Sequence, residues 1–304
     1  MRGGLKHALE VVLVRSGGTN LARLARRGQG LILAYHGIVP DGALVAGEHS
    51  LHLPQRQFAA QLRHLSLTHD LVPLEAVLDN GSPGRRPRAA ITFDDAYQGA
   101  VTVGVEELRR RSMPATIFVA PAFLGGQCFW WDGLADSAGR GLDEGLRRRA
   151  LDVLRGEHAA VCRWAHREGR SLQPLPPFAR TATEAELQAA VRQPGITLGS
   201  HSWSHPNLAR LGPDELRDEL ERPLRWLHDR FPGATVPWAA YPYGLYSPAV
   251  ERAAEAAGYR AGLAIAGGWI PRHGADRFAL PRLNLPAGMS QHGFVLRTSG
   301  LWSG

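Results

Sequence analysis

The chain has 304 residues, of which 44% are hydrophobic and 21% charged, an ordinary composition for a globular protein. It is long enough for one large domain or two small ones, and it can bury a sizeable core. Its two cysteines, Cys128 and Cys162, are too few for a disulfide framework or a four-cysteine zinc site. No apolar run approaches the ~20 residues that a membrane-spanning helix needs.

The excess of positive charge does not indicate a nucleic-acid partner. The formal net charge is +7, but of the 35 basic residues only Lys6 is a lysine. So complete a preference for arginine is typical of a genome-wide composition bias rather than of selection for phosphate contacts. Acidic residues are interspersed with the arginines, as between positions 219 and 225. Because no nucleic-acid-binding motif is recognisable, we expect no such partner.

The first 28 residues form a basic segment with helical periodicity. Glu10 interrupts its apolar stretch and residues 15–18 make a poor cleavage site, so we do not expect a signal peptide. Apolar side chains share one helical face at Leu5, Ala8, Leu9, Val12 and Leu13.

Two interpretations of this segment remain open. It packs on the domain as an ordinary helix, or its arginines and apolar face contact a membrane surface through residues 5–27. In both cases we expect a cytoplasmic or inner-membrane-associated protein. The arginines in question are Arg15, Arg23, Arg26 and Arg27.

Short apolar segments alternate with helical patterns along the rest of the chain. Alternation of this kind predicts a parallel sheet with helices outside it. The predicted strands comprise residues 31–35, 90–93, 115–119, 196–200, 236–241, 259–265 and 278–285. The predicted helices comprise residues 55–67, 98–111, 183–191, 213–231 and 247–257.

Seven strand–helix repeats predict an α/β barrel, one strand short of the eight-stranded form. No internal repeat and no long linker is visible, so we predict one domain over residues 29–304. Residues 125–190 are too long for an ordinary loop, and we interpret them as an insertion after the third strand. Two interpretations of the adjacent Trp130 and Trp131 in this insertion remain open: they form a platform for a substrate, or they are buried against the barrel.

The ends of the predicted strands carry the candidate chemistry. In parallel α/β barrels the catalytic groups lie just past the C-terminal ends of the strands. His36 follows the first strand, Asp94 and Asp95 the second, His201 and His205 the fourth, and residues 242–244 (PYG) the fifth.

Asp94 and Asp95 directly follow a buried-looking strand, where two adjacent carboxylates are costly unless a cation compensates them. Two neutral imidazoles and one carboxylate are a ligand set that Zn²⁺ or a similar divalent ion accepts, with one position left open for water. The sequence therefore predicts a metal site in which the second aspartate is free to act as a base.

Several motifs resemble those of the polysaccharide deacetylase family, also called carbohydrate esterase family 4 or the NodB homology domain. Residues 91–95 (ITFDD) and 199–206 (GSHSWSHP) are similar to its first two motifs, and residues 240–244 (AYPYG) to its third. Residues 33–38 and 280–283 resemble the first and last strands of a bacterial branch of the family. The similarity spans roughly residues 31–290.

This resemblance implies a distorted (β/α)7 barrel and metal-dependent removal of acetyl groups from N-acetylated sugars. It implies that Asp95, His201 and His205 bind the metal and that Asp94 is the catalytic base. It also implies that the backbone N–H of Tyr243 stabilises the oxyanion.

The resemblance further leads us to expect one divalent ion as cofactor, by preference Zn²⁺, with Co²⁺, Fe²⁺ or Ni²⁺ as alternatives. The expected contacts with the substrate are Pro242, Tyr243, Trp203 and Trp131.

Two positions depart from the family pattern. Where the third motif carries an arginine that pairs with the base, this chain has Ala240, and we expect Arg282 of the seventh strand to supply that charge. The late Leu-x-His motif that provides the general acid is absent. Its alternatives here are His36, His273 and His292, of which we favour His36 as a site residue without assigning the acid.

Three functions remain in competition. The first is a deacetylase of N-acetylhexosamine units in a cell-envelope or exported polysaccharide or its lipid-linked precursor, so that the partner is an N-acetylated glycan or glycolipid. The second is a metal-dependent amidohydrolase of a small acyl or formyl amide. The third is a non-catalytic carbohydrate-binding protein that uses Trp130, Trp131, Trp203 and Trp238 as stacking platforms.

Overall fold

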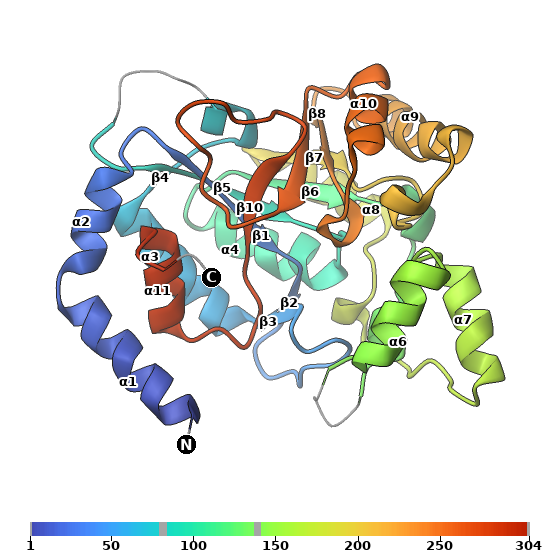
Figure 1. Cartoon of the computed structure of the whole chain (residues 1–304), viewed down its shortest axis with the longest axis horizontal. Coiled ribbons are helices and arrows are strands. Elements are labelled where there is room, and N and C mark those ends of the chain that lie inside the picture. Colours follow the sequence, from blue (N-terminus) through green and yellow to red (C-terminus); the bar gives the residue numbers. More distant parts are fainter. Residues whose placement is uncertain (1, 79–83, 137–140, 303–304) are drawn as a thin grey trace.

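The computed structural model describes residues 2–78, 84–136 and 141–302, with side chains from residue 8 onward. Seven parallel strands form a closed barrel, the distorted (β/α)7 architecture expected from the sequence (Figure 1). Around the ring they are β1 (Gly30–Tyr35), β5 (Arg88–Phe93), β6 (Ala115–Val119), β7 (Ile196–Ser200), β8 (Thr235–Ala240), β9 (Ala261–Ile265) and β10 (Leu280–Asn284).

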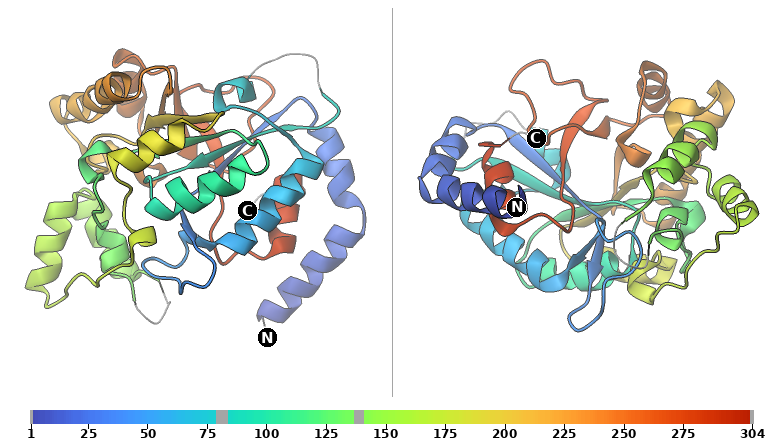
Figure 2. Two further views of the ribbon diagram at one scale, coloured as in Figure 1. Left: turned by 180° about the vertical axis from the view of Figure 1, so that it is seen from behind. Right: turned by 60° about the horizontal axis from the view of Figure 1, so that its bottom comes forward.

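Three short strands lie outside this ring. β4 (Asp70–Leu71) pairs with the beginning of β5, while β2 (Gly37–Val39) and β3 (His52–Pro54) form a small parallel sheet of their own. In Figure 1 and in the left view of Figure 2, β2 and β3 lie at the lower edge, beyond the C-terminal end of β1. They therefore extend the end of the barrel at which His36, Asp94 and Asp95 leave their strands.

The barrel strands are hydrophobic because both of their faces are covered. β1 and β6 are buried along their whole lengths, as expected of parallel strands between a core and surrounding helices. The surrounding helices are α3 (Gln55–Thr68), η2 (Ala100–Gly104) with α4 (Val105–Arg109), α8 (Glu184–Val191), α9 (Pro213–Arg230), α10 (Pro248–Ala256) and α11 (Gln291–Ser299).

The ring is joined between β1 and β10 over a short distance. Only the pairs Leu33–Leu283 and Ala34–Asn284 are in register there. The first half of β1 is bonded instead to the crossover before β10, because Ile32 N donates to Gly268 O (3.2 Å) and Ile270 N donates to Gly30 O (2.9 Å).

The long segment between β6 and β7 contains three helices that stand beside the barrel at the lower right of Figure 1. Its last part differs from the rest, because α8 packs on β7 and η2 as a barrel helix. The three outer helices are α5 (Trp130–Gly133), α6 (Glu144–Arg148), which continues as the π-helical η4 (Arg149–Val153), and α7 (His158–Arg167).

Two N-terminal helices, α1 (Arg2–Arg15) and α2 (Gly18–Ala25), pack against α11 on the opposite side of the barrel. Glu10 is buried there, and its carboxylate accepts a hydrogen bond from Ser290 Oγ (2.6 Å). Leu5, one member of the expected apolar face, lies outside the described side chains. Leu9, Val12, Leu21 and Leu24 of these helices are exposed.

No helix in the described ranges is both long and apolar enough to cross a bilayer.

Most predicted elements have the observed type, and the differences are local. The predicted helix 98–111 is observed as a π-helical turn followed by α4. The predicted strands 259–265 and 278–285 are too long, because their outer residues are turns: Tyr259 N bonds to Ala254 O and Ala279 N to Asp276 O.

Candidate active site

Polar residues that follow three strands meet in one pocket at the C-terminal end of the barrel. The pocket has a volume of about 390 Å³. His36 follows β1, Asp94 and Asp95 follow β5, and His201 follows β7. Backbone bonds to the neighbouring strands fix two of these positions, since Asp94 N donates to Tyr35 O (2.9 Å) and His201 N to Val119 O (2.8 Å).

Asp95, His201 and His205 converge on one point. Asp95 Oδ1 lies 3.2 Å from His205 Nε2 and 3.5 Å from His201 Nε2, and the two Nε2 atoms are 3.2 Å apart. All three side chains are buried. A buried carboxylate oxygen and two imidazole nitrogens that face one another at this distance leave room for a shared cation.

These residues fit a divalent metal ion. In a tetrahedral site with bonds of about 2.1 Å, neighbouring ligand atoms are about 3.4 Å apart, close to the distances observed here. Asp95 Oδ1 is buried and accepts no hydrogen bond from a described group, so it has an unused lone pair at the centre of the cluster. A bound cation would compensate it.

His201 is held in the form that can bind a metal. Its Nδ1 lies 2.7 Å from Ala240 O, which can only accept, so Nδ1 carries the proton and the lone pair of Nε2 faces Asp95. Burial lowers the pKa of His201 to about 4, although Asp94 acts in the opposite direction. The imidazole is therefore neutral at neutral pH.

The turns that carry these candidate ligands have a backbone conformation that is unusual for residues other than glycine. Asp95, Ala96, Ser202, His205 and Tyr243 have φ values between 48° and 68°, in the left-handed region. Such conformations cost free energy and cluster at functional sites. After His201, the chain turns back because Ser202 Oγ accepts a hydrogen bond from His205 N (3.0 Å), which brings the second imidazole beside the first.

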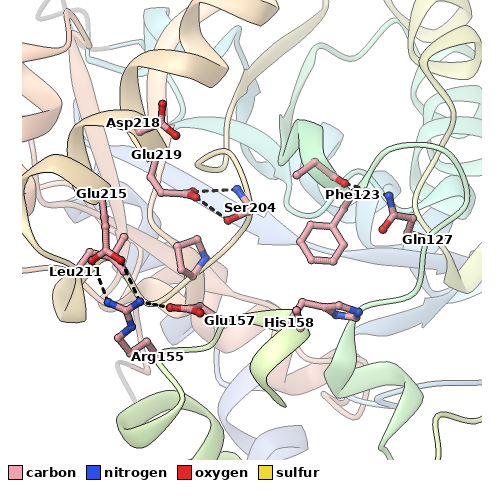
Figure 3. A pocket seen from close by; sticks show the side chains of 13 residues that line it. Phe123, Gln127, Arg155, Glu157, His158, Ser204, Leu211, Glu215, Asp218 and Glu219 are labelled. Atoms are coloured by element: carbon pink, nitrogen blue, oxygen red, sulfur yellow. Dashed lines mark hydrogen bonds and ion pairs between the residues drawn. The ribbon is translucent and has the colours of Figure 1, made fainter. Parts of the chain in front are cut away.

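Glu219 of α9 holds the same loop from behind (Figure 3). Its carboxylate accepts hydrogen bonds from Trp203 N (2.9 Å), Ser204 N (2.9 Å) and Ser204 Oγ (2.6 Å). The Arg222 guanidinium covers the Trp203 ring at 3.6 Å. α9 thus fixes the segment between the two histidines without contact with either imidazole.

Arg282 lies beneath the pocket and is completely buried. Its Nη1 and Nη2 donate to Asp94 Oδ1 (2.6 Å) and Oδ2 (2.8 Å), a two-point contact that orients the carboxylate. Burial alone would raise the pKa of Asp94, but the opposing effects, of which the charge of Arg282 is the largest, outweigh it and hold that pKa well below its usual range. Asp94 is therefore ionised at neutral pH.

Two segments of the pocket wall are tied to each other: the loop of residues 40–51, and residues 129–136 and 141–156 of the described chain. Buried Asp132 connects them by accepting from Glu48 N (2.8 Å), His52 Nε2 (2.8 Å) and Tyr97 Oη (2.5 Å). The carboxylate of Glu48 in turn accepts from Leu142 N (2.7 Å). A side chain on Gly37 would overlap the His52 ring, so this position requires glycine.

The aromatic residues named from the sequence are in different surroundings. Trp131 lines the pocket, and its ring lies 4.8 Å from that of His205, with the Tyr243 ring on another side of the same histidine at 4.7 Å. Pro242 is buried and does not line this pocket. Trp203 does not line it either, because the left-handed Ser202 turns the loop so that the indole lies under Arg222.

The candidates for a proton donor also differ in position. His36 lines the pocket together with Asp94 and Asp95. His273, which is exposed, and His292, at the start of α11, are not among the lining residues.

Several pocket residues were not singled out from the sequence. Asn284, two positions after Arg282 on β10, lines the pocket with a buried Oδ1 that accepts no hydrogen bond from the described residues. The alternation of β10 could have indicated it. Arg147 of α6 and Ser50 of the 40–51 loop carry no such signal, because no periodic pattern fixes their direction.

These features define a class: a parallel α/β barrel whose strand ends gather a carboxylate and two imidazoles beside a second carboxylate. A family model described as "Polysaccharide deacetylase" matches residues 81–262, more than half of the chain. The chain therefore belongs to the polysaccharide deacetylase family, a family of hydrolytic deacetylases.

Individual relatives agree with this assignment. YxkH of Bacillus subtilis, named as a polysaccharide deacetylase, is 24% identical over 270 residues, which cover 86% of this chain and 74% of that protein. Two solved structures share the fold. The Streptococcus pyogenes deacetylase PplD in complex with acetate has a TM-score of 0.62 at 18% identity, covering 89% of this chain and 98% of its own. IcaB from Ammonifex degensii has a TM-score of 0.61 at 14% identity, covering 90% and 96%.

Proposed function

We propose that this protein is a metal-dependent hydrolase that removes N-acetyl groups from N-acetylhexosamine units of a cell-envelope or exported polysaccharide, or of its lipid-linked precursor, and releases acetate. One observation carries the proposal: Asp95, His201 and His205 converge within 3.5 Å of one another, next to an Asp94 that Arg282 keeps ionised.

Asp95, His201 and His205 would hold the ion, and a Zn²⁺ ion bound there supplies a Lewis acid for the acetamide carbonyl and lowers the pKa of water. Co²⁺, Fe²⁺ and Ni²⁺ accept the same donors. The Nδ1–H of His201 remains bonded to Ala240 O, which keeps its Nε2 available to the ion.

Asp94 is the general base in this proposal. It accepts the proton of the water that attacks the acetyl carbon, since its carboxylate is ionised and its direction is fixed by Arg282. The backbone N–H of Tyr243, in the left-handed turn after β8, donates to the oxyanion that forms. The C–N bond then breaks, and the sugar nitrogen takes up a proton.

His36 is the site residue closest to a role in that last step. It lines the pocket together with both aspartates, a position from which we expect it to contact the substrate or the leaving nitrogen. His36→Ala is expected to lower kcat while metal content stays constant. Full activity of that variant would remove His36 from the mechanism.

The direct test measures acetate released from N-acetylglucosamine oligomers by the purified full chain. We expect release that a chelator abolishes and Zn²⁺ restores. Absence of metal binding and of acetate release would overturn the proposal. Release from formyl or short acyl amides alone would favour the second candidate, an amidohydrolase, which the modest pocket volume of about 390 Å³ allows.

A non-catalytic sugar-binding protein is less well supported. Trp130 and Trp238 are 1% and 3% exposed, so neither ring face is available for stacking on a sugar.

We also propose peripheral contact with a membrane through residues 5–27. Leu9, Val12, Leu21 and Leu24 are exposed, while Glu10 is buried away from the surface. The N-terminal end of α1 lies at the same edge as β2, β3 and α6 in Figure 1 and the left view of Figure 2. Deletion of residues 1–28 should release the protein from the cytoplasmic side of the membrane, and unchanged fractionation would refute the contact.

A further inference from the structure

Arg147 brings a positive charge to the wall of the catalytic pocket. It belongs to α6 and lines the same cavity as Asp94, Asp95 and the two histidines. It is the only lysine or arginine among the seventeen described residues that line this cavity.

The other charged side chains around the pocket already have partners. Asp94 is paired with Arg282, and Asp95 faces the two imidazoles, where the proposed cation would compensate its charge. Glu48 accepts from Leu142 N and Ser50 Oγ (2.8 Å), and the Asp143 side chain caps α6 through Leu146 N (2.8 Å). In residues 2–78, 84–136 and 141–302, no acidic group forms an ion pair with Arg147.

We propose that Arg147 binds an anionic group of the substrate, a carboxylate or a phosphate, close to the N-acetylated sugar. The inference rests on the proposed function and adds the chemical class of its substrate. A guanidinium binds both anions through two parallel hydrogen bonds, and a single uncompensated charge in a cleft attracts an oppositely charged ligand. α6 stands beside the barrel at the lower right of Figure 1. Because Arg147 of this helix lines the pocket, a glycan bound there would lie next to its side chain.

Three probes distinguish the sources of the charge. The first is a neutral N-acetylglucosamine tetramer, the second a tetrasaccharide of alternating N-acetylglucosamine and glucuronate, and the third the neutral tetramer with a phosphate on its reducing end. For the Zn²⁺-loaded full chain, we expect kcat/KM for one anionic probe to exceed that for the neutral probe by about tenfold. That preference should decrease when salt is raised from low to physiological concentration.

Arg147→Ala should abolish the preference, measured as the ratio of kcat/KM for the anionic and neutral probes. Arg148→Ala is the matched control, because Arg148 is an exposed neighbour on the same helix outside the pocket, and its ratio should equal that of the unchanged protein. The role of Arg147 is overturned if the Arg147→Ala protein has the same ratio as the unchanged protein, or if the unchanged protein shows no preference. Neither result bears on the proposed deacetylation.

The result for the proposed function is read separately. If no probe releases acetate, the proposed deacetylation fails for these glycans, and calorimetric binding of the same probes still decides on Arg147. Tighter binding of an anionic probe that Arg147→Ala removes supports the inference, and equal binding by both proteins overturns it.

Discussion

The base and the wall of the pocket are built in different ways. At the base, Asp94, Asp95 and His201 follow barrel strands directly, and main-chain bonds to adjacent strands hold Asp94 and His201. The wall includes residues 40–51 and, in the described part of the insertion, residues 129–136 and 141–156, and Glu48 and Asp132 connect these segments. In the proposed mechanism the base therefore carries the reaction, and we expect side chains of the wall to vary, and with them the substrate, without a change in the barrel.

The largest expected effect is at the base. Asp95→Asn removes the only carboxylate of the candidate metal centre, so metal affinity should collapse and kcat/KM should fall about 10³-fold or more. Metal content after dialysis and acetate release measure both. Asp229→Asn, at an exposed position, is the control. Retention of stoichiometric zinc by the Asp95→Asn protein would contradict the assignment of Asp95 as a metal ligand.

The next largest effect, on stability and activity, is expected from Arg282→Met. It leaves the Asp94 charge buried without a partner, which costs about 3–5 kcal/mol of folding free energy. The double variant Asp94→Asn with Arg282→Met should recover most of this stability in chemical denaturation and remain inactive. If the double variant is as unstable as the single one, the cost has another origin than the charge on Asp94.

A smaller effect is expected in the wall. Asp132→Asn weakens hydrogen bonds to His52, Tyr97 and the Glu48 amide, which together stabilise the wall by about 2–3 kcal/mol. KM for the glycan should rise while zinc affinity stays constant. An equal loss of zinc affinity would mean that base and wall are not separate units.

The smallest effect is expected at Glu219, which holds the His201–His205 loop. Glu219→Gln keeps the size of the side chain but removes the charge that three donors of the His201–His205 loop share. Zinc affinity should fall about tenfold, as is common for residues that orient metal ligands. Glu215→Gln, one turn away and bonded to Arg155, is the matched control. Equal affinities of the two variants would remove this role from Glu219.

Much of this architecture could be predicted because buried parallel strands have a simple pattern. β6 and β7 coincide with the predicted residues 115–119 and 196–200, and the rule that catalytic groups follow the strands led to the residues at the base. The ends of the strands were harder to predict, because a residue such as Tyr259 is apolar but lies in a turn.

The wall and the loops could not be derived in the same way. Trp203 was expected near the substrate, but the left-handed conformation of Ser202 directs its ring towards Arg222 of α9. A turn of this kind cannot be predicted from hydrophobic periodicity. Arg147 and Asp132 lie in the insertion, where side-chain directions depend on tertiary contacts made far along the chain. Their positions in the pocket wall could therefore be recognised only from the three-dimensional structure.

The narrow joint between β1 and β10 has a consequence for the alignment of Asp94. Arg282 comes directly before Leu283, one of the two β10 residues in register with β1. Below it the crossover intervenes, and a side chain on Gly268 would overlap Leu283. The β9–β10 crossover thus packs directly against the residue that follows Arg282, so we expect changes in its length to displace the guanidinium and, through it, the Asp94 carboxylate.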